Sequence, residues 1–409
     1  MERAEPARPS PRPCTFWAMR IAIVSDYYYP QLGGITEHVH GQASELVRRG
    51  HDVTVVIPRM LRVPKLADGH DLNPPFDLVR VGRAFPFYIN GSETLLTISP
   101  RTMPELDRLF TARRFDVVHI HNPFGPMLPI TATMRSQAPV TVGTVHSVVP
   151  EGYKLLRAMR PLLQIVFRRL DERISVSPAV GKSIGPYFPD LSFRTIPNGI
   201  DTEFFSPAAP AIARVDGKRT IIFVGRFDPR NGVKHMIGAF TALRRARSDV
   251  RLIIVGDGPL RPIVERLVPE QLRDDVLFAG RVDQLRPGYL ASADILCSPC
   301  SLASFGMVLL EGMSAGLPIV ASRLPGFEFV MRDGIDGLMI DRVDDEQAWV
   351  NALNRLLDDA ALRESMGQAG RGRALDTFAW PLVVDRLEAL YDEILQRKQS
   401  RAVALGAAA

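Results

Sequence analysis

Two segments of the chain, far apart in the sequence, each have the pattern of a buried strand, a glycine turn and a helix. In the first, residues 20–25 (RIAIVS) form an apolar run typical of a parallel strand that is buried on both faces. Gly33 and Gly34 follow, a helical pattern covers about 35–49, and a second apolar run lies at 52–57. This order predicts a Rossmann-like domain, because a crossover helix is what lets neighbouring strands run parallel.

The pattern restarts in the second half of the chain. The run 220–224 (TIIFV) leads into a glycine-arginine turn and a helical stretch, and 251–255 (RLIIV) leads into another glycine turn. Residues 206–219, between the two patterns, are rich in Pro and Ala and separate the domains. We therefore expect an α/β protein of two Rossmann-like, doubly wound domains. The expected parts are a disordered or mis-annotated N-terminal extension (1–18), an N-terminal domain (19–203), a C-terminal domain (204–380), a helix crossing back to the N-terminal domain (381–399) and a tail (400–409).

Composition excludes several classes of protein. The chain is 46% hydrophobic and 23% charged, as expected for a folded soluble protein, and it lacks the run of about 20 apolar residues of a membrane-spanning helix. A net charge of +5 with dispersed basic residues predicts no nucleic-acid partner. Cys297 and Cys300 form a lone CxxC without a second pair, which favours buried thiols over a zinc site. So few cysteines fit a reducing cytoplasm.

Arg226 comes directly after a buried strand, in a turn before a helix. Ligands of open α/β sheets bind beyond the carboxyl ends of strands, and a helix N-terminus there favours phosphate. An arginine adds charged, bidentate donors. From this segment alone, a surface arginine that closes the turn is an equally good interpretation.

A second turn, residues 301–316 (SLASFGMVLLEGMSAG), also follows a strand. Ser304, Phe305 and Gly306 open a predicted helix whose free N–H groups are suited to binding a diphosphate, and Glu311 lies about two turns inside. A carboxylate is an apt acceptor for the two hydroxyls of a ribose, and a glutamate in an apolar helix is costly without a partner. The alternative is a solvent-facing glutamate.

Two features of the first domain lie at the matching edge of its sheet. Gly33 and Gly34 allow close backbone approach, although a lone glycine pair fits any tight turn. His146 follows a buried strand, where an imidazole is placed to donate to a sugar hydroxyl or a leaving phosphate. A lone histidine of this kind is more often structural.

Together these segments resemble glycosyltransferase family 4, the retaining GT-B enzymes, and within it they are most similar to bacterial phosphatidylinositol mannosyltransferase-like enzymes. The matching segments cover most of residues 19–345 in the family's order: SDYYYPQLGGITEHV, HIHNPF, GTVHS, ISVS, IPNGID, FVGRFDPRNGV, LIIVGDGP and ADILCSPCSLASFGMVLLEGMSAGLPIVAS. The resemblance implies two domains facing a central cleft and a C-terminal crossing helix. It also implies retaining transfer of a sugar from a nucleoside-diphosphate sugar, such as GDP-mannose or a UDP-sugar, to a hydroxyl of a lipid or a cell-envelope glycan precursor.

The resemblance also assigns roles to single residues. His146 and Arg226 become the catalytic residues, which contact the donor sugar and the diphosphate. Glu311 holds the ribose and Val282 lines the base. The donor-binding residues are Gly33, Gly34, Arg230, Lys234, Val282, Ser304, Phe305, Gly306, Met307, Val308 and Glu311. No metal and no cofactor are expected, since side chains and helix dipoles neutralise the leaving diphosphate.

Two departures from the family pattern fall in the donor half. Asn231 stands where relatives carry a lysine, and Arg230 or Lys234 is the expected substitute. Ala303 stands at the first glutamate of the family's Glu-x7-Glu motif, which leaves the sugar's identity and transfer itself open. The alternatives are therefore a relative that binds a nucleotide sugar without transfer and a nucleotide-sugar epimerase on the same fold. A nicotinamide dehydrogenase is disfavoured, because no GxGxxG spacing is complete.

A basic amphipathic stretch at residues 151–173 bears on the acceptor. Tyr27, Lys154 and Arg157 are assigned to acceptor binding. Such a stretch is able to lie on an anionic membrane and present a lipid acceptor, which would place the protein peripherally on the inner face of the plasma membrane. An ordinary helix pair with solvated arginines is the slightly favoured alternative, and Pro161 is expected to break one continuous helix.

Overall fold

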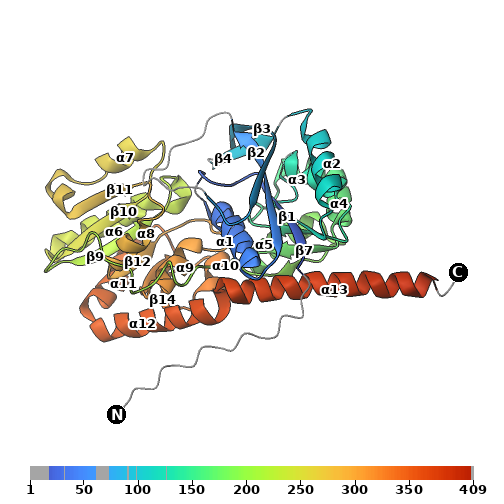
Figure 1. The fold of residues 1–409 in the computed structure, drawn as a ribbon. Helices are drawn as coiled ribbons and strands as arrows, with labels where there is room; N and C mark the ends of the chain where they lie inside the picture. The colour runs from blue at the N-terminus through green and yellow to red at the C-terminus, as the bar shows by residue number, and fades with distance from the viewer. Residues whose placement is uncertain are drawn as a thin grey trace, which may run out of the picture.

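The computed structural model describes residues 18–31, 33–60, 73–89, 92–97, 99–125 and 127–406. Apart from Ala18, the expected N-terminal extension therefore lies outside the described residues. The described chain forms two α/β halves, each built on one sheet, which lie side by side in Figure 1. The expected fold class is confirmed.

The sheet of the N-terminal half has the order β4-β3-β2-β1-β5-β6-β7-β8. Every neighbouring pair is parallel except β3 and β4, which are antiparallel. The strands are β1 (Arg20–Val24), β2 (Asp52–Met60), β3 (Asp77–Ile89), β4 (Ser92–Thr97), β5 (Val117–His121), β6 (Val140–Val145), β7 (Glu172–Ser175) and β8 (Arg194–Thr195). The helices are α1 (Gly34–Arg48), α2 (Thr102–Arg113), α3 (Leu128–Arg135), α4 (Lys154–Arg169), α5 (Pro178–Ile184) and the 3-10 turn η1 (Gly185–Tyr187).

The sheet of the C-terminal half is parallel throughout, with the order β11-β10-β9-β12-β13-β14. Its strands are β9 (Arg219–Val224), β10 (Val250–Val255), β11 (Val276–Gly280), β12 (Ile295–Ser298), β13 (Ile319–Ser322) and β14 (Gly337–Ile340). Its helices are α6 (Val233–Ala246), α7 (Arg261–Arg266), α8 (Arg286–Ala291), α9 (Met307–Ser314), α10 (Pro325–Val330), α11 (Glu346–Asp358) and α12 (Ala360–Arg373), with η2 (Pro229–Asn231), η3 (Glu270–Asp275) and the π-helical turn η4 (Ala374–Phe378).

Both sheets have a point where the strand order reverses. In the N-terminal sheet β1 lies between β2 and β5, and in the C-terminal sheet β9 lies between β10 and β12. Helices that leave such a point in opposite directions open a crevice outside the carboxyl ends of the strands. The Gly33-Gly34 loop follows β1 and the Arg226 loop follows β9, so both predicted donor loops begin at these crevices.

The last helix, α13 (Trp380–Gly406), leaves the C-terminal half and runs along the N-terminal half (Figure 1). Its first residue, Trp380, packs against Gly41 and Gly199 so closely that a Cβ at either glycine would overlap the indole. The buried Glu388 accepts hydrogen bonds from Arg49 (2.6 Å) and is 2.8 Å from His51 Nε2. The predicted crossing helix is confirmed, but it includes residues 400–406, which were expected to form a tail.

One other expectation was wrong, and two strands were not predicted. Pro161 lies inside α4, which runs through it without a break. The missing N–H of Pro161 leaves the carbonyl of Arg157 without its helical donor. Both residues are on the exposed side of the helix, where solvent is able to take the place of that donor. The edge strands β4 and β14 were not predicted. β14 is a buried apolar run (GLMI), but a run of four residues does not distinguish a strand from a buried helix segment.

Candidate active site

Residues of both halves meet at the loop that follows β1. A Cβ built on Gly34, at the start of α1, would lie 3.2 Å from Cγ of Met307 at the start of α9. Arg281 Nη2, from the loop after β11, donates a hydrogen bond of 2.8 Å to the carbonyl of Pro30. The predicted donor residues Gly34 and Met307 are thus brought together, although one belongs to each half.

Ser304 also joins the halves. Its Oγ accepts a hydrogen bond of 2.9 Å from the N–H of Val148, two residues after His146. Its carbonyl accepts one of 2.6 Å from Ser177 Oγ at the start of α5. The loop that carries His146 is therefore held directly against the loop that precedes α9.

The turn after β9 presents Arg226 on its exposed side. The carbonyl of Arg226 accepts hydrogen bonds from the N–H of Asp228 (2.8 Å) and from Nδ2 of Asn231 (2.9 Å). Asn231, where relatives carry a lysine, thus holds the turn rather than supplying charge. Arg230 pairs with Asp228 at 2.9 Å, whereas Lys234 is exposed and makes no ion pair within the described part of the chain.

The helix α9 begins at a glycine that no other residue can replace without strain. Gly306 has φ 119°, and a Cβ there would lie 2.8 Å from the ring of Phe327. Phe305 packs its ring against Phe329 and Phe378, with centroids 6.1 and 5.9 Å away. The ring of Phe305 is therefore part of the core, and only the backbone of this residue is available to contact a nucleotide sugar. Val308 is half-buried and Val282 is buried.

Glu311 lies one turn inside α9 and is 1% exposed, so the solvent-facing alternative was wrong. Its Oε1 lies 3.2 Å from Nη1 of Arg286, whereas Oε2 has no hydrogen-bond partner among the described residues. Burial raises the pKa of Glu311 to about 8. A buried carboxyl oxygen without a partner is costly, which fits an atom reserved for a ligand hydroxyl.

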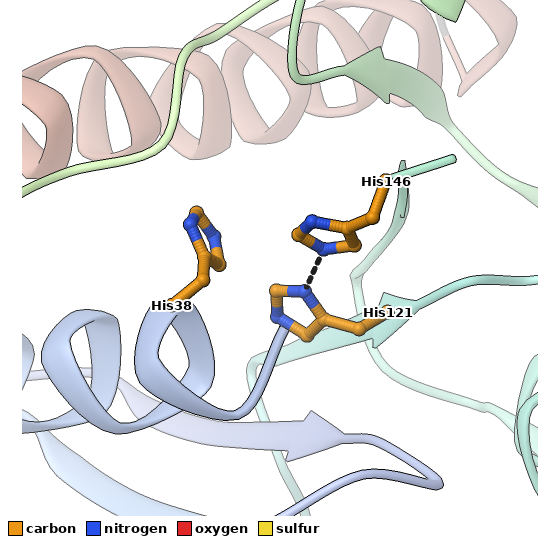
Figure 2. Close-up of side chains that lie close together, drawn as sticks. All are labelled: His38, His121 and His146. Atoms are coloured by element: carbon orange, nitrogen blue, oxygen red, sulfur yellow. Dashed lines mark hydrogen bonds between the residues drawn. The ribbon is translucent and has the colours of Figure 1, made fainter. Parts of the chain in front are cut away.

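Three histidines gather at the carboxyl edge of the N-terminal sheet. Figure 2 shows His38 on α1, His121 at the end of β5 and His146 on the loop after β6. Nδ1 of His121 and Nε2 of His146 share a hydrogen bond of 2.8 Å, and the His38 ring centroid lies 5.2 and 5.0 Å from theirs. Burial lowers the pKa of His38 to about 3 and holds the pKa values of His121 and His146 well below the usual range. All three rings are therefore neutral at physiological pH.

The geometry of this cluster favours a hydrogen-bonded array over a metal centre. One ligand atom of each ring lies within 4.8 Å of the others. Two nitrogens bound to one tetrahedral zinc ion lie about 3.3 Å apart, farther than the hydrogen-bonded pair of His121 and His146. A metal ion would have to break that bond, and the expected absence of a metal stays a prediction. His38 and His121 were not named from the sequence, although both stand in the quoted family segments.

Of the predicted acceptor residues, Lys154 and Arg157 are exposed on α4, and Tyr27 is half-buried after β1. No helix of the described residues is long and apolar enough to cross a membrane. Cys297 is buried and Cys300 is half-buried, and neither forms a disulfide.

Comparison with known proteins matches both halves to glycosyltransferase models. Residues 32–204 match "Glycosyltransferase Family 4" and residues 218–359 match "Glycosyl transferases group 1". A phosphatidyl-myo-inositol mannosyltransferase of Mycobacterium leprae is 31% identical over 92% of this chain and 97% of its own length. The chain belongs to glycosyltransferase family 4. This family 4 enzyme is a hexosyltransferase that takes its sugar from a nucleotide sugar.

More distant relatives and solved structures agree with this family. A GDP-mannose-dependent α-(1-6)-phosphatidylinositol monomannoside mannosyltransferase of Mycolicibacterium smegmatis is 27% identical over 88% of this chain and 94% of its own length. The sucrose-phosphate synthase of Thermosynechococcus elongatus superposes with a TM-score of 0.71 at 21% identity, covering 93% of this chain and all of its own. Anabaena HepE with UDP and glucose also gives 0.71, at 17% identity, over 91% of this chain and 99% of its own. At such identities the superpositions establish the GT-B fold alone.

Proposed function

We propose that this family 4 enzyme transfers mannose from GDP-mannose, with retention of configuration, to a hydroxyl of a membrane lipid. The observation that carries the proposal is the meeting of donor residues from both halves, Gly34 against Met307, beside the unpartnered Oε2 of Glu311. The mannosyltransferase relatives named above support mannose as the sugar and a phosphatidylinositol-type lipid as the acceptor. A UDP-sugar is the alternative donor.

Each part of the site has a distinct chemical task in this proposal. Arg226 and the free N–H groups at the start of α9 stabilise the charge that develops on the leaving diphosphate. Oε2 of Glu311 accepts a ribose hydroxyl, and the neutral His146 ring donates one hydrogen bond to the sugar or phosphate. Contacts between the halves exclude water, which would otherwise hydrolyse the donor.

The exposed face of α4 supports a lipid acceptor. Leu155, Leu162 and Ile165 are 52%, 49% and 55% exposed, and their spacing places them along one side of the helix. The exposed cations on the same helix are Lys154, Arg157, Arg168 and Arg169. An apolar stripe beside cations is suited to the surface of an anionic membrane. This arrangement favours a peripheral membrane contact over a helix with merely solvated arginines.

Replacing both Leu162 and Ile165 by serine is expected to weaken binding to phosphatidylinositol-containing vesicles by at least about tenfold, because each loses about 1.5–3 kcal/mol of apolar burial when inserted. Vesicle co-sedimentation measures the effect. The matched control replaces Ile263 and Ile335, which are 55% and 50% exposed on the C-terminal half, and it should bind as the unaltered protein does. Equal binding by both double variants would contradict a membrane face on α4.

The donor and acceptor are tested together in one panel. GDP-mannose, UDP-glucose and ADP-glucose are compared by thermal shift, and each is then incubated with phosphatidylinositol vesicles and analysed by mass spectrometry. We expect GDP-mannose to stabilise the protein and to yield a lipid heavier by one hexose, with an α linkage by NMR. If none of the nucleotide sugars stabilises the protein, the proposed donor site is wrong.

A second candidate function rests on Ala303, which is half-buried in the loop before α9 where the family has a glutamate. The methyl group of Ala303 does not accept hydrogen bonds from the hydroxyls of the transferred sugar, as a carboxylate would. The alternative is therefore a protein that binds a nucleotide sugar without transferase activity. It predicts stabilisation by a nucleotide sugar with no product in the same panel. An epimerised donor or free sugar formed without acceptor would instead indicate an epimerase.

A further inference from the structure

A buried cluster of four ionisable side chains, Glu311 among them, spans the two halves. Arg286, the first residue of α8, contacts three carboxyl groups: Oε1 of Glu311 at 3.2 Å, Oδ1 of Asp283 at 3.2 Å and Oε1 of Glu37 at 2.7 Å. Glu37 comes from α1 in the N-terminal half, and the other three residues belong to the C-terminal half. None of the four side chains is more than 12% exposed.

One guanidinium is thus shared by three carboxyl groups. The ring of Phe205, from the segment that joins the halves, lies 5.5 Å from the guanidinium carbon and restricts its position. Among the described residues, Oε2 of Glu311 and Nε of Arg286 have no hydrogen-bond partner. Ionisable groups buried in this way need partners inside the protein, so removing one member leaves the others poorly placed. The cluster therefore fixes where the free oxygen of Glu311 lies.

We propose that Arg286 is a positioning residue for Glu311, and that Glu37 completes this positioning only when the two halves are closed. The proposal rests on the proposed role of Glu311 in donor binding. When the two halves separate, Glu37 moves away with α1. The guanidinium of Arg286 then contacts only Asp283 and Glu311. Closing brings Glu37 back to a distance of 2.7 Å. Donor binding and closure then favour each other, because the ligand binds best to the state in which Glu311 is held.

The test compares Glu37→Gln, Arg286→Gln and the double variant by calorimetric titration with GDP. We expect Glu37→Gln to raise the Kd for GDP by on the order of tenfold, although the residue lies in the opposite half from the proposed nucleoside site. Arg286→Gln should raise it further, and the double variant should be no worse than Arg286→Gln alone. The matched control, Glu393→Gln, breaks a pair with Arg194 between α13 and the N-terminal half and should leave the Kd unchanged.

Closure has its own readout. By small-angle X-ray scattering, Glu37→Gln without ligand should have a larger radius of gyration than the unaltered protein, and Glu393→Gln should not. If Arg286→Gln does not fold, Arg286→Lys replaces it. Unchanged GDP affinity for Glu37→Gln, or fully additive effects of the two substitutions, would overturn the proposal. If the unaltered protein itself fails to bind GDP, UDP and ADP, the proposed function is wrong. If Glu37→Gln without ligand has the same radius of gyration as the unaltered protein, the contact between Glu37 and Arg286 does not hold the halves closed.

Discussion

Replacing Arg226 by alanine is expected to lower kcat for sugar transfer by about 100- to 1,000-fold, the usual effect of removing one group that stabilises developing charge. The loss arises because the turn after β9 presents this guanidinium at the switch point of the donor sheet. Arg226 is exposed, so the free energy of unfolding should change by less than about 0.5 kcal/mol. Steady-state transfer assays and urea unfolding of the same preparation check both expectations.

Two further variants separate charge from geometry at this position. Arg226→Lys keeps a cation but loses bidentate donation, and it should recover part of the activity. Arg245→Ala removes another exposed arginine, from the far end of α6, and should transfer sugar at the unaltered rate. If Arg226→Ala retained kcat within about threefold, its assignment to the diphosphate would be wrong.

Replacing Trp380 by alanine is expected to lower the free energy of unfolding by about 3–5 kcal/mol, as for other large aromatic residues truncated in a core. The indole packs against Gly41 and Gly199, and neither glycine has a side chain that could fill the space. The crossing helix would lose its first anchor on the N-terminal half. Urea unfolding followed by circular dichroism measures the change.

The control for this prediction is on the same helix. Val403→Ala shortens a side chain that is 73% exposed near the end of α13, and the unfolding midpoint should not move. A loss below about 1 kcal/mol for Trp380→Ala would mean that α13 is held chiefly by its ion pairs, such as that between Arg49 and Glu388.

Much of the fold was predictable because central parallel strands have an unmistakable composition. Residues 21–24 and 221–223 are almost completely buried, and the sequence shows them as apolar runs before glycine turns. The edge strand β14 is also a buried apolar run, but it was missed because four residues do not distinguish a strand from a helix segment. Among the site residues, Arg226 and Glu311 were found because each stands in a short segment with a recognisable setting.

The sequence by itself determined the two Rossmann-like halves, the crossing helix and the family, because each depends on short-range patterns of apolar residues, glycines and local motifs. Only the tertiary structure decided the partners of Glu311. Arg286 and Glu37 are separated by 249 positions and meet because α1 and α8 come together where the two halves are in contact. It likewise decided which side of α4 is exposed and that His38, His121 and His146 form one neutral cluster. Such contacts depend on how whole elements dock, and docking energy is spread over many residues of both partners, so no single segment of the sequence encodes it.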